Sequence, residues 1–538
     1  MNASKEAARD WVAAHERQLS DWHQIIWNYA EPAWREYRSA AWYVHTLREH
    51  GFSVEEGSGG MPTAFCAEWR NGEGGPTVGA YAEYDATPDH SQQAVPWEAP
   101  REGLSRYAAG HVDPHSALGI GALAGVLAAQ HAMRQHHIAG RLKFFGEPAE
   151  KTCGSKPIHA AKGYYDDVDA FISFHPAYLL PHCNSVNWDV HAGCSYGRVF
   201  TFECRHAETW GGPSPLRTLW PAHALAPRAP GALDAACLMY TSSKYLYGAM
   251  LPRNSGWYIT EYMMTGGQAT ADNQTARIAQ LYYCWRAPTV EMMERVAEVL
   301  ENNAQHVAAM THCTCRGEWV QKNRPGLPNH VMARLGYANL RLAGPPQFGE
   351  EARAFGRKIL ENLGYTPPED PFLPECSQLH DPEEVDAILR ESLPPWQKNM
   401  LSDDYTEYGW HAPTVRLFIG RCMVERPQDG PQTVLPSWAF DALGGKRECI
   451  DPTIFSAGRT IAYIILDLLT KPEVLARAWE EFTERTGGGK GGSRWIPPLL
   501  PADHPAPIHF RWPEYVTTPR GERQWWLPES PFDRASGT

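Results

Sequence analysis

Short apolar runs alternate with helical segments through the first third of the chain, and this pattern limits the fold more than any other feature of the sequence. The runs have the length of buried strands, whereas 116–136 is a long stretch of apolar and small residues with the length of a helix. Strands separated by helices predict an α/β domain with a largely parallel central sheet. The predicted strands are 64–69, 77–81, 142–145 and 170–174.

A second, smaller unit interrupts this pattern. Between residues 190 and 322, three stretches alternate apolar and polar residues and two have helical spacing, which predicts a small α+β sandwich. The α/β pattern resumes over 323–485, so we expect 1–189 and 323–485 to form one domain around the insertion. Residues 486–538 begin with the glycine-rich TGGGKGGS and continue with many prolines and tryptophans, which predicts a flexible linker and an extended tail.

The net charge and the cysteines indicate which binding partners and which cellular compartment to expect. The chain has a formal net charge of −13 and lacks a block of lysines and arginines, so we expect no nucleic-acid or membrane partner. No run of about 18 apolar residues is present, and the start of the chain is charged, without the apolar segment of a secretory signal. Twelve scattered cysteines are typical of reduced thiols, and together these features predict a cytoplasmic protein.

Side chains that bind metals or move protons lie near the ends of the predicted strands. Asp113 and His115 come just before the long helix, Glu150 and Lys151 follow the strand at 142–145, and His175 follows the strand core at 170–174. Imidazoles and carboxylates are common ligands of divalent metals, and a carboxylate next to a metal can act as a general base. Each segment alone is weak evidence in a chain with 23 histidines, but ligands of α/β sheets bind beyond the carboxyl ends of the strands.

The order of these segments resembles that of a known enzyme family. The succession YAEYDATP, GHVDPHSALGIGAL, GEPAEK and DDVDAFISFHP is similar to the zinc- or manganese-dependent amidohydrolases and metallopeptidases, which include aminoacylases, auxin-conjugate hydrolases and aminobenzoyl-glutamate hydrolases. GMPTAF, PAH with GALDA, TGG and RAPT extend the resemblance over about residues 20 to 485. It implies a catalytic α/β domain that is split by a lid domain, and a homodimer or larger homo-oligomer formed through that lid.

The resemblance implies a metal site, and the departures from the family pattern imply that it holds one ion. Asp113, His115 and His175 match the ligands of the first metal, with Asp113 where the family has a bridging cysteine. The second metal would lack two ligands, because Lys151 replaces a glutamate and Pro436 aligns with a late histidine. We therefore expect one divalent metal per chain, manganese or zinc, with the carboxylate of Asp113 shifting the preference toward manganese.

The same resemblance implies roles for other residues. Glu150 matches the catalytic general base, and the ammonium of Lys151 would supply positive charge where the second metal lies in relatives. His223 aligns with a lid histidine that reaches the active site of a partner subunit, although Glu208 and His206 are alternatives. Glu407 and His411, in DYTEYGWHAPT, are candidates for substrate contact, and His411 could equally replace a missing ligand or be structural.

Three functions remain open at this point. The first is hydrolysis of a C–N bond, most simply the amide of an N-acyl or N-aroyl amino acid. The second is hydrolytic removal of the amino group from an activated aromatic amine, which would release ammonia without a carboxylic acid. The third is a binding protein that has lost catalysis with its second metal. Retention of Glu150 beside a complete first site favours an enzyme that acts on a small molecule.

Overall fold

The larger domain is built on a seven-stranded sheet whose centre is parallel. The structure, a computed structural model, describes residues 1–177, 182–204, 230–251, 257–270, 275–427, 434–519 and 521–525. The strand order is β1-β2-β4-β3-β5-β11-β6. The four strands β4, β3, β5 and β11 pair in parallel, whereas β1, β2 and β6 are antiparallel at the two edges. The strands are β1 (Ser53–Glu56), β2 (Phe65–Asn71), β3 (Thr77–Ala82), β4 (Gly140–Gly146), β5 (Ala170–Pro176), β6 (Ser185–Val186) and β11 (Thr414–Ile419).

Two long apolar helices, α4 and α12, pack against each other and against the central strands. Both are long and apolar enough to cross a bilayer by length and composition alone, but 94% and 78% of their apolar windows are buried in the fold. They are therefore core helices, and α1 packs on both of them. The helices of this domain are α1 (Ala3–Ala14), α2 (Glu16–Tyr29), α3 (Tyr37–Glu49), α4 (His115–Gln135), α5 (Ser155–Ala161), α8 (His330–Ala343), α9 (Glu350–Asn362), α10 (Pro382–Ser392), α11 (Ser437–Gly445), α12 (Arg447–Thr470) and α13 (Pro472–Thr486).

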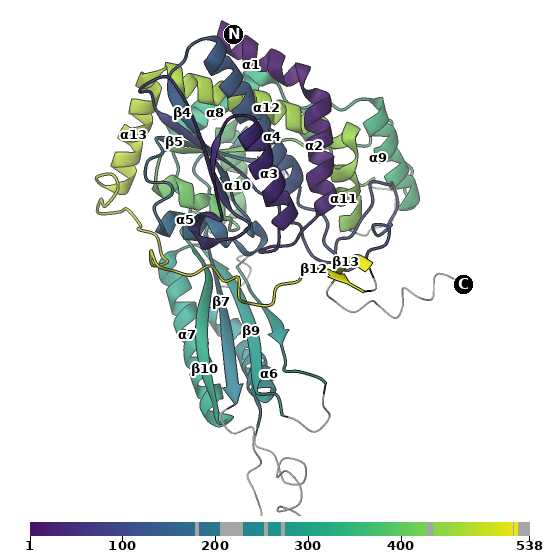
Figure 1. Cartoon of the computed structure of the whole chain (residues 1–538), viewed down its shortest axis with the longest axis vertical. Coiled ribbons are helices and arrows are strands. Elements are labelled where there is room, and N and C mark those ends of the chain that lie inside the picture. The colour runs from purple at the N-terminus through teal and green to yellow at the C-terminus, as the bar shows by residue number, and fades with distance from the viewer. Residues whose placement is uncertain are drawn as a thin grey trace, which may run out of the picture.

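The inserted unit, which we call the lid, projects from the larger domain (Figure 1). Its four-stranded antiparallel sheet has the order β10-β7-β9-β8, and helices α6 and α7 form a core with it. The elements are β7 (Cys194–Cys204), α6 (Ala232–Met250), β8 (Ile259–Thr265), β9 (Ile278–Ala287), α7 (Val290–Met310) and β10 (Cys313–Asn323). The predicted α/β fold with an inserted α+β sandwich is confirmed.

Two helix boundaries differ from what the sequence pattern indicates. Residues 6–28 have apolar positions at helical spacing throughout, but they form two helices, because the chain leaves helical geometry at His15 between α1 and α2. The helical stretch predicted over 116–136 begins one residue earlier, at His115, with Pro114 as its N-cap residue. That one-residue shift places the ligand candidate His115 on the helix itself, where its backbone is fixed.

The tail lies over the junction between the two domains (Figure 1). The glycine-rich segment after α13 makes successive backbone turns, and the chain then passes Arg35, whose guanidinium donates to the carbonyls of Ile508 and Phe510 at 3.3 and 3.0 Å. Trp512 packs between Trp34 of the larger domain and Tyr282 of the lid, with ring centroids 6.2 and 5.9 Å away. The tail therefore contributes one hydrophobic cluster shared by both domains, and ends in the hairpin β12 (Tyr515–Thr518) and β13 (Gly521–Trp525).

We expect Trp512→Ala to lower the free energy of unfolding by about 3 kcal/mol, because removing a buried indole leaves a cavity. Trp512 is 6% exposed. Trp396→Ala, at a position that is 54% exposed, is the matched control and should change stability little. Calorimetry would measure the difference as a lower melting temperature for the first variant alone. Equal melting temperatures would show that the tail does not hold the two domains together.

Candidate metal centre

Three adjacent parallel strands bring the predicted site residues to one edge of the sheet. Because β4, β3 and β5 are neighbouring parallel strands, their carboxyl ends lie at the same edge of the sheet, and so do the segments that follow them. His175 lies in β5 itself, and Glu150 follows β4 in a short 3-10 turn, η2 (Glu150–Thr152). The end of β3 leads directly into Glu83, a residue to which the sequence assigned no role.

The start of α4 lies close to the end of β3, which places His115 beside Glu83. Gly119, one turn after His115, permits this approach, because a Cβ atom there would lie 2.8 Å from the carbonyl oxygen of Glu83. Asp113 precedes the helix in the loop, and its backbone carbonyl accepts a hydrogen bond from the His115 N–H at 2.9 Å. The loop and the helix start therefore present both side chains to the strand ends.

The turn that carries Glu150 and Lys151 is held in an unusual backbone conformation. Ala149 and Cys153, on either side of η2, have φ values of 58° and 49°, in the left-handed region that residues with a Cβ rarely adopt. The Ala149 N–H donates to the buried carboxylate of Glu36 at 2.7 Å. Such strain is typical of functional sites, where surrounding contacts hold the backbone in place.

Four predicted residues converge here at distances that suit ligands of one metal. His115 Nε2 lies 3.6 Å from Asp113 Oδ2 and 3.3 Å from Glu150 Oε2, and His175 Nε2 lies 3.3 Å from Asp113 Oδ1. Atoms that share a metal at about 2.1 Å in tetrahedral geometry lie about 3.4 Å from one another. Asp113 Oδ1 and His115 Nε2 are buried and have no hydrogen-bond partner. Asp113 Oδ1, 3.3 Å from His175 Nε2, and His115 Nε2, 3.3 Å from Glu150 Oε2, are therefore placed to bind a divalent cation.

The remaining polar atoms of these ligands are held by neighbouring groups. His115 Nδ1 lies 2.8 Å from Asp85 Oδ1, and His175 Nδ1 lies 2.7 Å from the Pro176 carbonyl. Both partners can only accept, so each Nδ1 carries a proton. Burial opposes the charged form of His115, but Asp113 and Asp85 outweigh it and raise the pKa of this ring, so a metal at its Nε2 would replace a proton. Asp113 Oδ2 accepts from the Lys151 ammonium at 2.5 Å. The site is therefore oriented before any metal binds.

The charge states suit metal binding and proton transfer. Burial lowers the pKa of His175 to about 4, so the ring is neutral near pH 7. Burial opposes ionisation of Asp113 and Glu150, but the Lys151 ammonium holds the pKa of both carboxyls below their usual range. Lys151 contacts Glu150 Oε2 at 3.0 Å as well as Asp113, and these carboxylates outweigh burial to raise its pKa. Glu150 is thus ionised, as a general base must be.

Sequence reasoning missed a second lysine of the site, which is fully buried, and its partners. The Lys156 ammonium, on α5, lies 2.6 Å from Glu83 Oε1 and 2.5 Å from Asp404 Oδ1, and all three side chains are almost completely buried. Asp404 begins η5 (Asp404–Trp410), 248 positions further along the chain than Lys156. A carboxylate directly after a strand in YAEYD was the available signal for Glu83. Nothing local in the sequence indicates that Lys156 faces both acids.

Glu407 and His411 lie together in a different network. Glu407 accepts from the Arg324 backbone and guanidinium at 2.5 to 2.8 Å, and His411 Nε2 is 3.0 Å from the same guanidinium. His411 Nδ1 pairs with Asp166 at 3.0 Å. Their contact with substrate stays a prediction, and so does the role of His223, which lies with Glu208 and His206 outside the described residues.

Asp441, on α11, is fully buried beside the loop that leads to the metal centre. A Cβ atom added to Gly110 would lie 2.3 Å from its Oδ2, so the carboxyl packs directly on that loop. Burial raises the pKa of Asp441 to about 7. The folded protein therefore binds a proton here that the unfolded chain, with a pKa of about 3.9, releases more easily.

We expect this carboxyl to make the protein less stable as pH rises from about 4 to about 7, because ionisation is favoured in the unfolded chain. The Asp441→Asn variant should lose that part of the pH dependence and be more stable than the wild type at pH 8. Urea unfolding across this pH range measures the difference, and Asp503→Asn, at an exposed position, is the control. The same slope in wild type and Asp441→Asn would contradict the assignment.

The sequence of this chain is similar to those of several known hydrolases. No family model matches the chain. One of the two p-aminobenzoyl-glutamate hydrolase subunits of Escherichia coli (strain K12) is 26% identical over 354 residues, or 66% of this chain and 68% of that protein. The indole-3-acetyl-aspartic acid hydrolase of Enterobacter agglomerans is 28% identical over 272 residues, or 40% of this chain and 60% of the relative.

Two further comparisons cover different shares of the chain. Thermostable carboxypeptidase 1 of Saccharolobus solfataricus is 31% identical over 172 residues, which are 31% of this chain and 42% of that protein. The crystal structure of an aminobenzoyl-glutamate utilization protein from Klebsiella pneumoniae aligns with 83% of this chain and 98% of its own, at 14% identity and a TM-score of 0.48. The sequence matches to the carboxypeptidase and to the indole-3-acetyl-aspartic acid hydrolase span less than two thirds of those relatives.

Proposed function

Since its relatives match the metal-dependent amidohydrolase family and confirm the resemblance predicted from the motifs, we propose that this chain hydrolyses the amide of an N-acyl or N-aroyl amino acid. The observation that carries the proposal is Glu150, an ionised carboxylate 3.3 Å from the unpartnered Nε2 of His115. It lies where a general base must lie relative to the ligands. The substrate is a small molecule, as the relatives' names indicate for those proteins.

Asp113, His115 and His175 would hold one divalent metal, manganese or zinc. When bound, such an ion polarises the substrate carbonyl and lowers the pKa of water. Glu150 takes the proton of the attacking water and passes it to the leaving nitrogen. Lys151 keeps Glu150 ionised and, as an ammonium, stabilises negative charge that develops on the carbonyl oxygen. Its contacts with both Asp113 and Glu150 support its assignment to the place of a second metal.

We expect Glu150→Gln to lower kcat by about 10²–10⁴, because the amide cannot accept the proton. The assay is release of amino acid from a panel of N-acyl and N-aroyl amino acids. Metal content, measured by plasma mass spectrometry, should stay near one ion per chain in both proteins. Full activity in the variant would remove Glu150 as the base, and a content near two would show that other residues complete a second site.

The products separate the two reactions and the inactive alternative. Amide cleavage gives a carboxylic acid and an amino acid in equal amounts. Release of ammonia from an aromatic amine, without an acid product, would favour the deamination reaction instead. A wild-type protein that loads metal and turns over neither kind of substrate would support the binding protein.

The exposed face of the lid supports assembly of this enzyme through that domain. Large apolar side chains are exposed on α6 and on the edge strand β8, and Tyr245 and Tyr262 are 83% and 60% exposed. Edge strands and exposed aromatic patches are where chains associate. The proposed cytoplasmic location is supported by the twelve cysteines, all within the described residues and all free.

We expect light scattering to give about twice the 60.2 kDa chain mass for the wild type. Tyr262→Asp should shift the protein toward the monomer, because a buried charge is costly at an apolar interface. Trp97→Asp, at a position that is 52% exposed on the larger domain, is the matched control and should leave the mass unchanged. A dimer that survives Tyr262→Asp would place the interface elsewhere.

A further inference from the structure

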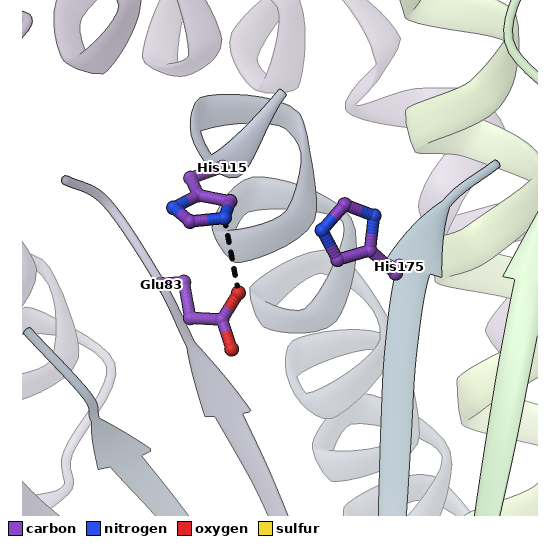
Figure 2. A group of neighbouring side chains, drawn as sticks. All are labelled: Glu83, His115 and His175. Carbon is purple, nitrogen blue, oxygen red and sulfur yellow. Dashed lines mark ion pairs between the residues drawn. The ribbon is translucent and has the colours of Figure 1, made fainter. Parts of the chain in front are cut away.

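Glu83 directs one oxygen of a fully buried carboxylate at the metal centre and leaves it without a hydrogen bond. Its Oε2 has no partner, and the closest basic atom is His115 Nε2 at 3.4 Å, which is also without one. Figure 2 shows Glu83, His115 and His175 meeting from the end of β3, the start of α4 and β5. The ion pair between these two atoms, dashed in Figure 2, is longer at 3.4 Å than a charge-assisted hydrogen bond of about 2.7–2.9 Å, which is the spacing expected if a cation lies between them.

The spacing identifies that group as a cation. Ligand atoms of Glu83, His115 and His175 all lie within 4.8 Å of one another, and the 3.4 Å separation of the first two equals the spacing of two ligands on one metal. Nε2 of His115 also lies 3.6 Å from Asp113. Because Nδ1 bonds to Asp85, Nε2 is the ring atom that faces one ion within reach of both carboxylates.

The other oxygen of Glu83 is held by a buried ion pair. Lys156 Nζ contacts Glu83 Oε1 at 2.6 Å and Asp404 Oδ1 at 2.5 Å, so the ammonium orients the carboxylate and is itself neutralised by Asp404. If Glu83 served only as the partner of Lys156, its second oxygen would be buried without a hydrogen bond, which is costly for a polar group. Metal ligands commonly have this arrangement, with one atom on the metal and the other held by a neighbour.

We propose that Glu83 is a fourth protein ligand of the metal, with Lys156 and Asp404 as the residues that position it. This rests on the metal site of the proposed function but not on its substrate. The ligand set becomes two imidazoles and two carboxylates, which favours manganese over zinc more strongly than Asp113 alone does.

Manganese binding to the chelator-treated full chain, measured by isothermal titration, tests the proposal. Glu83→Gln keeps the bond from Lys156 but removes the anionic ligand, and we expect its Kd for manganese to rise at least tenfold. The matched control is Glu147→Gln, which replaces a buried glutamate directly after β4 that contacts His159 and Tyr165 instead. Its Kd should stay within twofold of the wild type. A Kd for Glu83→Gln within that same range would overturn the proposal.

A second measurement gives a direct spectroscopic signature and does not depend on affinity. Cobalt(II) bound to Glu83→Gln should have ligand-field bands that differ from those of the wild type, whereas Glu147→Gln should leave the bands unchanged. Identical bands in cobalt-loaded Glu83→Gln and wild type would overturn the assignment. If the bands change but the manganese-loaded wild type hydrolyses no amide or aromatic amine, the ligand stands and the proposed reaction fails.

Discussion

The metal centre depends on two lysines, the fully buried Lys156 and the partly exposed Lys151, each held between two carboxylates. Lys151 lies between Asp113 and Glu150, and Lys156 between Glu83 and Asp404. Taking these ions out of water costs several kcal/mol per group, and close pairing is what offsets the cost. The Lys156 pairs join the end of β3 to α5 and η5, and the Lys151–Asp113 pair joins the turn after β4 to the loop before α4, so these contacts hold together the segments that carry the site.

The arrangement of the chain around the sheet was largely predictable. Periodicity located the central strands, and their parallel order explains why Asp113, His115, Glu150 and His175 meet, although they span more than sixty positions. The ends of helices were harder to predict, since nothing in the local sequence indicates that α1 ends before His15. Local helix propensities differ by only about a few tenths of a kcal/mol per residue, so tertiary packing decides where one helix ends and the next begins.

Of the two lysines, only Lys151 could be assigned to the site from the sequence. The family that the sequence resembles has a glutamate at the position of Lys151, so a positive side chain there was noticeable. Lys156 lies in an ordinary short helix, and its importance comes from Asp404, which the fold brings back from the second half of the domain. The role of Glu83 likewise depends on which of its oxygens is left free, a fact of side-chain geometry that no spacing encodes.

The charges of these groups also bear on the number of metals. The two ammonium groups contact four carboxylates, so the cluster keeps an excess of two negative charges when every group is ionised. One divalent cation among Glu83, Asp113, His115 and His175, as proposed above, would balance that excess. In the proposed one-metal site, Lys151 and Lys156 would act as permanent positive charges beside the ion, and they would not dissociate as a second metal can.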